Sequence, residues 1–284
     1  MSRILITGHK GSLGSLLLNR LNEQGHETVV LETEKRIQDA TFFDGVENPD
    51  TIDVLYHLAA SIFVPRSWEK PDEFIESNVL GVTRVLEFCR KHKIALVHVS
   101  SYIYGVPNYL PIDENHDLSV SNPYALSKKM AEEMVTFYGE NFDLNYNIIR
   151  PFNVFGPAQK KELLLQEILT QITSSDRIEV QDVTPRRDYI YIDDVIDFLV
   201  LAKDKMMNEP FNLGSGVSYS VEELIAICQD VFGTNLPVIS KGAKRRNEIP
   251  DTVADMTKAK KVFGWKLQYS LKEGIEQIKE KSEG

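Results

Sequence analysis

The feature that most constrains the fold is a glycine-rich segment close to the N-terminus. Residues 7–14 read Thr-Gly-His-Lys-Gly-Ser-Leu-Gly and directly follow the apolar run Ile4-Leu5-Ile6. A strand that turns through closely spaced glycines into a helix is typical of sites that hold a dinucleotide pyrophosphate. We expect Gly8 to allow the sharp turn, Gly11 to let the backbone approach the phosphates, and Gly14 to let the helix pack against the sheet. Ordinary turn chemistry is the alternative, so the rest of the sequence has to decide.

The composition excludes several classes of function. The 284 residues are 42% hydrophobic and 26% charged, as in ordinary globular proteins, and the net charge is −10. We do not expect so acidic a chain to bind nucleic acid or an anionic membrane surface. Cys89 and Cys228 both fall in apolar helical patterns, so we expect neither a disulfide framework nor a metal site. The chain begins with a strand instead of a signal peptide and has no membrane-spanning stretch, which predicts a cytoplasmic enzyme.

Short apolar runs alternate with helical patterns in the first half of the chain, which predicts a parallel sheet covered by helices. Residues 33–52 are poorly patterned, and Thr41-Phe42-Phe43 is the best candidate for a strand there. We expect strands near 3–7, 28–31, 53–58, 95–100, 146–149, 178–181, 189–191 and 210–213, and helices near 13–24, 72–92, 124–140, 161–173, 193–206, 220–232, 255–263 and 270–281.

An acidic residue ends the second predicted strand. Glu32 lies eighteen positions beyond Gly14, where a carboxylate accepts both ribose hydroxyls of an adenosine and repels a 2′-phosphate. This favours NAD over NADP as the cofactor. NADP stays possible because Lys35 and Arg36 follow closely, and a cation there can hold the phosphate. The alternative for Glu32 is a solvated glutamate at a strand end.

The third predicted strand closes with His57-Leu58-Ala59-Ala60. Small residues at this point let the backbone touch the phosphate and ribose of a cofactor at the carboxyl edge of the sheet. For His57 we favour a space-filling role in the core over a catalytic role.

The pattern that points to chemistry is Tyr124-Ala125-Leu126-Ser127-Lys128. In a helix over 124–140, Tyr124 and Lys128 lie four residues apart on one face. A neighbouring ammonium stabilises a phenolate and is expected to lower the tyrosine pKa from about 10 toward neutrality, as a general acid/base requires. Surface helices also produce this spacing by chance. Here, however, the pair follows a strand that ends in Ser100-Ser101, whose hydroxyls can hold a substrate oxygen.

Taken together, these segments resemble the extended short-chain dehydrogenases/reductases of the sugar-nucleotide epimerase/dehydratase family. The resemblance covers nearly the full length of the chain. It rests on Thr7 to Gly14, His57 to Ala60, Asn78 to Thr83, Tyr124 with Lys128, Arg150 to Pro157, Arg187 to Ile190, Asn212 to Gly216, Arg245 to Glu248 and Ala254 to Trp265.

The resemblance implies the fold and its division into domains. The implied fold is α/β, with a Rossmann-type doubly wound parallel sheet and a smaller C-terminal α/β lobe that binds the substrate. Family members usually pair through the helices that carry Asn78 and Tyr124, so a homodimer is expected. The implied NAD-binding domain comprises 1–157 plus 186–213, and the implied sugar-nucleotide lobe comprises 158–185 plus 214–284.

The resemblance also implies roles for single residues. Tyr124 would take and return the proton of a sugar hydroxyl, and Lys128 would bind the nicotinamide ribose and bias Tyr124. A serine would hydrogen-bond the same sugar oxygen. The turn that follows is one residue shorter than usual, so counting back from Tyr104-Gly105 selects Ser100 and counting forward from the strand selects Ser101. Ser101 is favoured because the second of the two serines normally faces the substrate in family members, and Ser100 stays open. The implied cofactor contacts are Gly8, Gly11, Ser12, Leu13, Gly14, Glu32, Leu58, Ala59, Ala60, Tyr124, Lys128 and Pro151, and the implied substrate contacts are Ser61, Asn153, Arg187, Arg245 and Glu248.

A sugar nucleotide is anionic, and the chain has basic residues suited to it. Guanidinium groups offer paired donors in a fixed fork, which fits Arg187 and Arg245 as ligands of a diphosphate. Lys241, Lys244 and Arg246 extend the basic character around Arg245. An exposed, solvated loop is the alternative for this cluster.

Two reactions remain open. Sugar dehydratases of the family carry an Asp-Glu pair after the strand-end hydroxyl, and this chain has Tyr102 and Ile103 there, so dehydration is disfavoured. Glu32 favours a 4-epimerase, which keeps NAD bound and passes through a transient 4-keto sugar. The alternative is a 4-keto-sugar-nucleotide reductase that uses exchangeable NADPH, and the short region 156–187 favours it. A non-catalytic nucleotide sensor is less favoured, because a sensor does not need the tyrosine–lysine pair.

Overall fold

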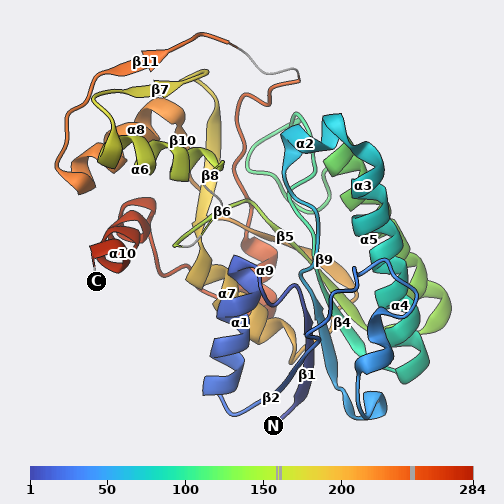
Figure 1. Cartoon of the computed structure of the whole chain (residues 1–284). Helices are drawn as coiled ribbons and strands as arrows, with labels where there is room; N and C mark the ends of the chain where they lie inside the picture. Colours follow the sequence, from blue (N-terminus) through green and yellow to red (C-terminus); the bar gives the residue numbers. More distant parts are fainter. Residues whose placement is uncertain (158, 160–161, 244–246, 284) are drawn as a thin grey trace. The chain divides into compact units, whose positions relative to one another are not determined.

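The structure is a computed structural model and describes every residue except 158, 160, 161, 244–246 and 284 (Figure 1). The chain divides into two compact units. The first unit comprises 1–105, 117–150 and 196–211, and the second comprises 106–116, 151–195 and 212–284. The domain boundaries that the sequence predicts stay a prediction.

A six-stranded sheet organises the first unit. Its strands are β1 (Arg3–Thr7), β2 (Glu27–Val30), β3 (Val54–His57), β4 (Ala95–Val99), β5 (Tyr146–Pro151) and β9 (Glu209–Leu213). Their order is β2-β1-β3-β4-β5-β9, and neighbours from β2 through β5 pair in parallel. The chain runs from β1 outward to β2 and then returns to β3 on the other side of β1, the reversal typical of doubly wound folds. The predicted Rossmann-type fold is confirmed.

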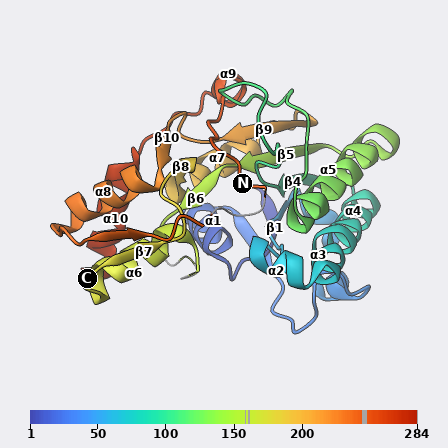
Figure 2. The ribbon, with the colours of Figure 1, turned by 90° about the horizontal axis from the view of Figure 1, so that it is seen from above.

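Helices cover both faces of this sheet (Figures 1 and 2). One face carries α1 (Ser12–Glu23) and the end of α7 (Ile192–Ala202), where Arg20 forms an ion pair with Asp197. The core on the other face consists of fully buried aliphatic side chains such as Leu55, Val85 and Val135, each contributing about 1.5–3 kcal/mol by burial. The helical elements of that face are α2 (Val64–Glu69), α3 (Pro71–Ile75), the π-helical turn η3 (Glu76–Leu80), α4 (Gly81–His92) and α5 (Pro123–Phe142).

The segment between β2 and β3 forms no strand, and the strand predicted at Thr41-Phe42-Phe43 is wrong. Its regular structure is two short 3-10 turns, η1 (Phe42–Gly45) and η2 (Pro49–Thr51). The Phe43 ring stacks on the ring of Phe88 in α4, with 4.4 Å between centroids. This apolar pair covers the edge of the core next to a helix. Its hydrophobicity therefore does not indicate the two-residue alternation of a strand.

The second unit is built around two small sheets and several helices. Its three-stranded sheet has the order β10-β8-β6, and its two-stranded sheet pairs β11 with β7 in parallel. Ser220 and Glu223 form a capping box at the start of α8. The strands are β6 (Asn153–Phe155), β7 (Ile178–Val180), β8 (Arg186–Tyr191), β10 (Ser218–Ser220) and β11 (Val238–Ser240), and the helices are α6 (Leu164–Ser174), α8 (Val221–Phe232), α9 (Thr257–Phe263) and α10 (Leu271–Glu283).

Among the residues that the structure describes, none of the helices combines the length and the apolar composition that a membrane crossing requires.

Candidate functional site

The glycine-rich segment forms a tight loop at the carboxyl end of β1. Gly8 has a φ of 77°, and a Cβ there would lie 2.6 Å from the backbone nitrogen of Ala59. A Cβ on Gly14 would lie 2.2 Å from the Gly8 carbonyl oxygen. Gly14 is therefore needed for packing of the helix against the loop itself. The expected role of Gly14 in packing the helix against the sheet itself stays a prediction.

The first turn of α1 is open to an anion. Its N-cap is Gly11, which has no side chain to satisfy the first amide groups, and the turn that begins with Ser12 and Leu13 carries no acidic residue. Unsatisfied N–H groups and the positive end of the helix dipole favour a phosphate at such a position. Gly8, where a Cβ would lie 2.6 Å from the Ala59 nitrogen, and Gly11 add no side chains to this turn. These residues fit a dinucleotide.

Replacing Gly14 by alanine tests this loop. We expect the variant to bind NAD at least about tenfold more weakly and to lose about 1–3 kcal/mol of unfolding free energy, because backbone atoms have to move aside. Isothermal calorimetry and urea unfolding measure the two effects. Gly45→Ala is the control, since a Cβ there makes only ordinary contact with Leu31 at 3.6 Å. Equal NAD affinity in the Gly14 variant and the control would remove the loop from cofactor binding.

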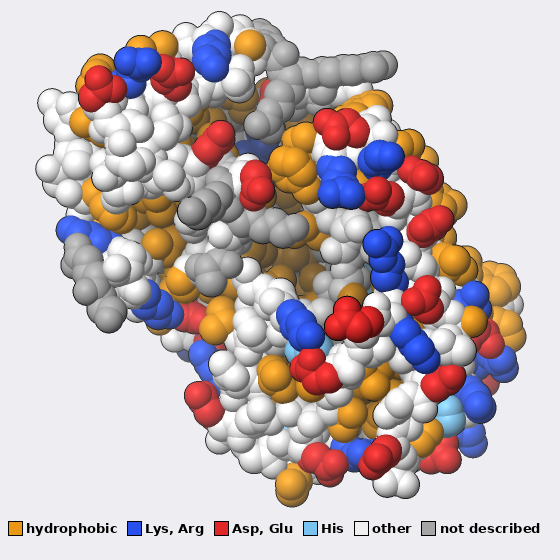
Figure 3. Space-filling view, viewed as in Figure 1, with side chains coloured by type: hydrophobic (Ala, Val, Ile, Leu, Met, Phe, Trp, Pro, Cys, Tyr) orange, Lys and Arg blue, Asp and Glu red, His pale blue; other side chains and the backbone are white. Residues whose placement is uncertain are grey.

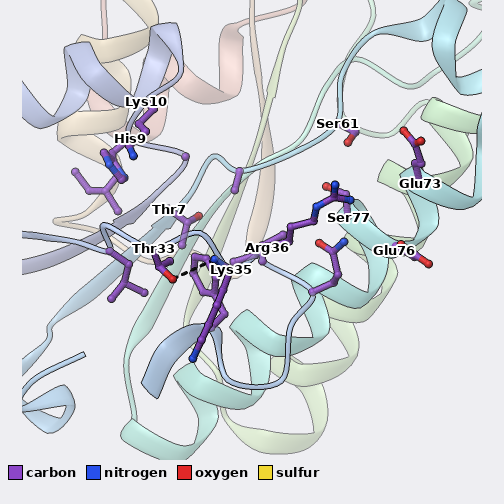
Figure 4. Close-up of a pocket in the computed structure, with 17 residues that line it drawn as sticks. Thr7, His9, Lys10, Thr33, Lys35, Arg36, Ser61, Glu73, Glu76 and Ser77 are labelled. Atoms are coloured by element: carbon purple, nitrogen blue, oxygen red, sulfur yellow. Dashed lines mark hydrogen bonds between the residues drawn. The ribbon is translucent and has the colours of Figure 1, made fainter. Parts of the chain in front are cut away.

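A cavity of about 390 Å³ opens beside this loop within the first unit (Figure 4). Its size is within the range of small-molecule sites. The carboxyl ends of β1, β2 and β3 meet around it, which is where doubly wound folds bind ligands. Figure 4 shows His9 and Lys10 on one side and Ser61, Glu73 and Ser77 on the other. The lining residues are Ile6, Thr7, Gly8, His9, Lys10, Leu31, Thr33, Lys35, Arg36, Ile37, Gln38, Phe42, Ala59, Ser61, Glu73, Glu76 and Ser77.

Glu32 lies beside the cavity and is not part of its lining. Its exposed carboxylate pairs with Lys10 Nζ at 2.8 Å and with His9 Nε2 at 3.0 Å. The hydrogen bonds from Lys10 and His9 lower the pKa of Glu32, so the carboxylate is ionised at neutral pH. Glu32, the residue predicted to bind the adenosine ribose, is thus held by two residues of the glycine-rich loop.

The loop after β3 carries the next predicted cofactor contacts. The backbone N–H of Leu58 donates to the Thr7 carbonyl at 3.2 Å, which places Leu58 beside the end of β1. Ala59 and Ser61 line the cavity, with Ala60 between them. Pro151 is the last residue of β5 and is buried.

The predicted catalytic residues meet at the start of α5. Asn122 caps this helix by accepting the Ala125 N–H at 2.8 Å, which begins the helix one residue before Tyr124. The side chains of Tyr124 and Ser101 are joined by a hydrogen bond. The buried Ser100 hydroxyl has no hydrogen-bond partner within the described part of the chain. The structure therefore turns Ser101 toward Tyr124.

Lys128 lies one helical turn after Tyr124, and its ammonium points to the sheet. Its Nζ donates to the Val99 carbonyl at 2.7 Å, and its side chain is buried. Burial lowers the pKa of Lys128 to about 8, although the charge of Glu132 acts in the opposite direction. Burial raises the pKa of Tyr124 to about 12, and the Ser101 hydrogen bond only partly offsets this. The expected lowering of the phenol pKa by Lys128 is wrong for this structure, because the ammonium is directed at Val99.

The lowered pKa of Lys128 makes a prediction about stability. The folded protein holds the charged form at a cost, so Lys128→Met is expected to raise the unfolding free energy of the nucleotide-free protein at pH 7 by about 1–3 kcal/mol. Between pH 8 and 10.5 the unfolded chain binds more protons at this site, so the wild-type protein regains stability and the difference shrinks. Urea unfolding at pH 7 and pH 10 measures it. Lys129→Met, at a half-exposed neighbour, is the control, and a Lys128 effect independent of pH would contradict the assignment.

A chain of hydrogen bonds joins the cavity wall to the turn that carries Tyr124. Asn78, in η3, accepts the Ser61 N–H at 2.8 Å and donates to the Ser61 carbonyl at 2.9 Å. Its amide also donates to Ser127 Oγ at 2.9 Å, and Ser127 Oγ donates to the Tyr124 carbonyl at 2.8 Å. The sequence predicted one helix over 72–92, but a π-turn interrupts it here, as is frequent at functional sites. Sequence reasoning missed Ser127, although its place inside the Tyr-x-x-x-Lys pattern could have identified it.

Two histidines lie in the sheet below Lys128. His57 and His98 face each other on β3 and β4, and their rings stack with centroids 5.4 Å apart. Burial and the nearby charge of Lys128 lower the pKa of His57 to about 3 and also lower the pKa of His98. His57 Nδ1 lies 2.8 Å from Thr7 Oγ1. His57 is a neutral core residue, in agreement with the space-filling role.

Three of the predicted substrate contacts, Asn153, Arg187 and Glu248, lie in the second unit, whereas the predicted substrate contact Ser61 lies in the first unit and lines the cofactor cavity. Arg187 forms an ion pair with Glu248 and also donates to the backbone carbonyl of Ile249 at 2.7 Å. The Asn153 amide donates to the Asp188 carbonyl at 2.9 Å. The structure thus brings Arg187 and Glu248 together. The predicted Arg245, with Lys244 and Arg246, lies outside the described residues.

Asp188 organises this part of the second unit, and sequence reasoning did not single it out. Its buried carboxylate accepts the backbone N–H groups of Ser215, Gly216 and Ala254 at 2.6, 2.9 and 3.0 Å. A Cβ on Gly214 would lie 2.7 Å from the same carboxylate. The predicted motifs around Arg187 and Asn212 to Gly216 are therefore neighbours because one aspartate holds them together.

Comparisons with known proteins agree with this geometry. A sequence model of the NAD dependent epimerase/dehydratase family matches residues 4–214. The UDP-glucose 4-epimerase of Mycolicibacterium smegmatis is 32% identical, and the match covers 96% of this chain and 96% of the relative. The structure of the Thermotoga maritima UDP-glucose 4-epimerase with UDP-glucose is similar with a TM-score of 0.91 and 25% identity, over 99% of this chain and 100% of that chain. The Thermus thermophilus UDP-glucose 4-epimerase in complex with NAD gives a TM-score of 0.88 and 25% identity, over 99% of each chain.

Proposed function

This chain is an NAD-dependent enzyme of the NAD dependent epimerase/dehydratase family, and from that premise we propose that it is a sugar-nucleotide 4-epimerase that acts on UDP-glucose and its C4 epimer. The observation that carries the proposal is the hydrogen-bond chain from Ser61 in the cofactor cavity through Asn78 and Ser127 to Tyr124. It couples the wall of a dinucleotide cavity to the residue suited to proton transfer. A hydrogen-bond chain of this kind fixes the position of Tyr124 relative to the cofactor cavity, as catalysis by oriented groups requires.

Tyr124 is the proposed general acid/base. When bound, NAD supplies the acceptor, and later the donor, of the hydride at the sugar carbon. In its deprotonated form the Tyr124 side chain takes the proton of the sugar hydroxyl, and the phenol so formed returns the proton after the other face of the sugar is presented. The Ser101 hydroxyl, already hydrogen-bonded to Tyr124, is positioned to contact the same oxygen. Ser100, which is buried directly after the end of β4, is not assigned a role.

Lys128 is proposed to bind the ribose of the cofactor. An ammonium has three donors, so the bond to Val99 leaves others for the ribose hydroxyls of the cofactor. Because the ammonium is directed at the Val99 carbonyl, Lys128 is not assigned a role in lowering the pKa of Tyr124. Burial holds the pKa of Lys128 near 8, so the charged form persists at neutral pH.

Binding of the substrate diphosphate is proposed for Arg187, supported by Asn153. Arg187 is oriented by Glu248 and by the Ile249 carbonyl, which fixes the plane of its guanidinium. We propose that Glu248 contacts the nucleoside ribose and that Arg245 adds a second cation, as the family resemblance implies.

An assay without added cofactor tests the function. Purified protein incubated with UDP-glucose is expected to form UDP-galactose, detected by proton NMR of the anomeric signals, and mass spectrometry of the released small molecules is expected to find NAD. A 4-keto-sugar reductase would instead consume NADPH and leave UDP-glucose unchanged, and that outcome would overturn the proposal. The short region 156–187 no longer favours a reductase, because the match covers the whole Thermotoga maritima epimerase chain.

We also propose a homodimer formed through α4 and α5. Supporting residues are the exposed apolar side chains of Leu126, Phe137 and Phe142 on α5. Size-exclusion chromatography with light scattering is expected to give twice the chain mass of 32.3 kDa, and a monomer at all concentrations would contradict the dimer. The cytoplasmic location stays a prediction.

A further inference from the structure

We propose that the end of β4 and the start of α5 enclose a site for one water molecule, held by the His98 ring, the Ser100 hydroxyl and the Lys128 ammonium, and that His98 thereby positions Lys128. The site itself follows from contacts within the first unit. Its effect on catalysis rests on the proposed function, in which Lys128 binds the ribose of the cofactor. The inference goes beyond that function because it assigns a ligand to two side chains that have no part in the proposed reaction.

Two histidines continue the core-facing side of the sheet toward its carboxyl end. His57 and His98 are register partners on β3 and β4, and both are buried. Two residues earlier on the same strands, Leu55 and Leu96 belong to the aliphatic core on the face that α4 and α5 cover. Because side chains alternate between the two faces of a sheet, the histidines project toward these helices as well.

Ser100 continues the same side of β4. Its backbone N–H donates to the Ile149 carbonyl at 2.7 Å, so the pairing with β5 extends one residue beyond the strand. His98 and Ser100 therefore project from one face, roughly 6.6 Å apart along the backbone, which is two strand rises. A single water molecule with two hydrogen bonds of about 2.8 Å spans such a gap.

Both side chains lack a polar partner inside the described part of the chain. His98 is 0% exposed and Ser100 is 6% exposed, and the two ring nitrogens of His98 and the Ser100 Oγ have no hydrogen bond there. On the face of the first unit seen in Figure 3, by contrast, acidic and basic side chains are interspersed and meet bulk water. Buried polar groups in native proteins almost always have a partner, and an apolar ring would have filled this space without one.

The third partner reaches the strand between these two side chains. Lys128 Nζ donates to the Val99 carbonyl at 2.7 Å, and Val99 separates the two side chains in the sequence. The ammonium therefore lies at their level of β4. It has three N–H donors, and the bond to Val99 uses one of them. A water molecule that accepts from Lys128 and donates to His98 and Ser100 has three partners, the usual number for buried water.

Among the described residues, no carboxylate forms an ion pair with Lys128 in place of this water. Glu132 lies one turn further along α5, but both of its oxygens accept from Arg150, at distances of 2.6 and 3.1 Å. Burial, and then the charge of Lys128, lower the pKa of His98, so its ring is neutral and one nitrogen has a free lone pair. A neutral ring and a hydroxyl bind the water without adding a second charge beside the ammonium.

The water molecule fixes the direction of the remaining donor. With one N–H bonded to Val99 and a second bonded to the water, the tetrahedral ammonium presents its third N–H away from these two groups, for the ribose of the cofactor. When a group has to be oriented, an error of about 1 Å can cost about 100-fold in rate. His98 is therefore a positioning residue, which acts on Lys128 through the water and does not touch the substrate.

The pKa of Lys128 in nucleotide-free protein tests the site apart from catalysis, and NMR titration of protein labelled with ¹³C at lysine Cε measures it. We expect His98→Phe, which keeps a ring and removes its nitrogens, to lower this pKa by at least about 1, because the ammonium loses a hydrogen-bonded partner. His98→Asn, whose amide still binds water, is expected to restore about half of the difference. His57→Phe is the matched control and is expected to change the pKa by less than about 0.3, because the neutral His57 ring is bonded to Thr7 instead.

A double-mutant cycle tests whether His98 and Ser100 act through one molecule. Ser100→Ala is expected to lower the pKa of Lys128 by about 0.5–1 alone, but by less than about 0.3 when it is combined with His98→Phe. A high-resolution crystal structure is expected to show an ordered water within about 3.2 Å of a His98 ring nitrogen, Ser100 Oγ and Lys128 Nζ. Turnover of UDP-glucose is expected to fall about tenfold in His98→Phe at an unchanged KM, and to be restored in part by His98→Asn.

The outcomes separate this proposal from the proposed function. If His98→Phe leaves the pKa of Lys128 unchanged and makes the protein more resistant to urea, the ring nitrogens have no partner and the water site is overturned. Equal effects of His98→Phe and His57→Phe, or additive effects of His98→Phe and Ser100→Ala, also overturn it. Should His98→Phe fail to fold, Ser100→Ala and the crystal structure still decide. If the pKa falls as expected but the wild-type protein does not convert UDP-glucose, the water site stands and the epimerase fails.

Discussion

Tyr124→Phe is expected to lower the turnover of UDP-glucose by about 10²–10⁴-fold, the usual contribution of a positioned acid/base. The variant loses the only atom that would carry the sugar proton, while the ring keeps its packing against Phe74. We expect NAD binding to change by less than about threefold, because the Asn78–Ser127 chain contacts the backbone carbonyl of Tyr124 and not its phenol. Proton NMR of the sugar nucleotides measures turnover, and calorimetry measures NAD binding.

Tyr138→Phe is the matched control for this experiment. It removes a phenol from the same helix, one that donates to Glu87 at 2.5 Å and has no place in the proposed mechanism. We expect its turnover to stay within about twofold of the wild type. If Tyr124→Phe also kept near wild-type turnover, proton transfer would have to be reassigned, while the cofactor cavity would be unaffected.

Glu132→Gln is expected to destabilise the protein by about 3–5 kcal/mol, the usual cost of breaking a buried ion pair. Glu132, one turn after Lys128 on α5, pairs with the buried guanidinium of Arg150 through Nη2 at 2.6 Å and Nε at 3.1 Å. Arg150 Nη1 also donates to Tyr104 Oη at 2.9 Å. Without the carboxylate charge, the guanidinium remains buried and uncompensated. Urea unfolding of the nucleotide-free protein measures the difference.

The next residue supplies the control for this substitution. Glu133 is exposed and its carboxylate lies 4.0 Å from Lys129, so Glu133→Gln is expected to change the unfolding free energy by less than about 0.5 kcal/mol. A loss below about 1 kcal/mol for Glu132→Gln would show that water reaches Arg150 and that the pair is not the anchor of α5 to β5.

The sequence predicted the parts of the site that depend on local backbone rules. The roles of Gly8 and Gly14 could be predicted because the loop imposes constraints that only glycine tolerates. These are the positive φ of Gly8 and the 2.2 Å that would separate a Cβ on Gly14 from the Gly8 carbonyl oxygen. The helix at Tyr124 could be predicted because Asn122-Pro123 is a strong signal for the start of a helix. In the structure α5 begins at Pro123. The alternation of strands and helices then predicted the parallel sheet.

Features that depend on distant partners could not be predicted. The Phe43 ring belongs to a turn because Phe88, on another helix, offers it a stacking partner. The pKa of Tyr124 is set by burial and by the direction of Lys128, which helical spacing does not reveal. The pairing of Glu132 with Arg150 joins residues on α5 and β5, and a single sequence contains no sign of it.

The position of β2 at the edge of the sheet has a consequence for cofactor exchange. β2 has only four residues and is paired with β1 alone. Strands with one neighbour open locally at lower free energy than central strands, so the amides of β2 are the ones where deuterium would enter the sheet earliest. A dinucleotide that bridges β1 and the end of β2 would slow this opening by mass action, which makes amide protection a direct report of cofactor occupancy.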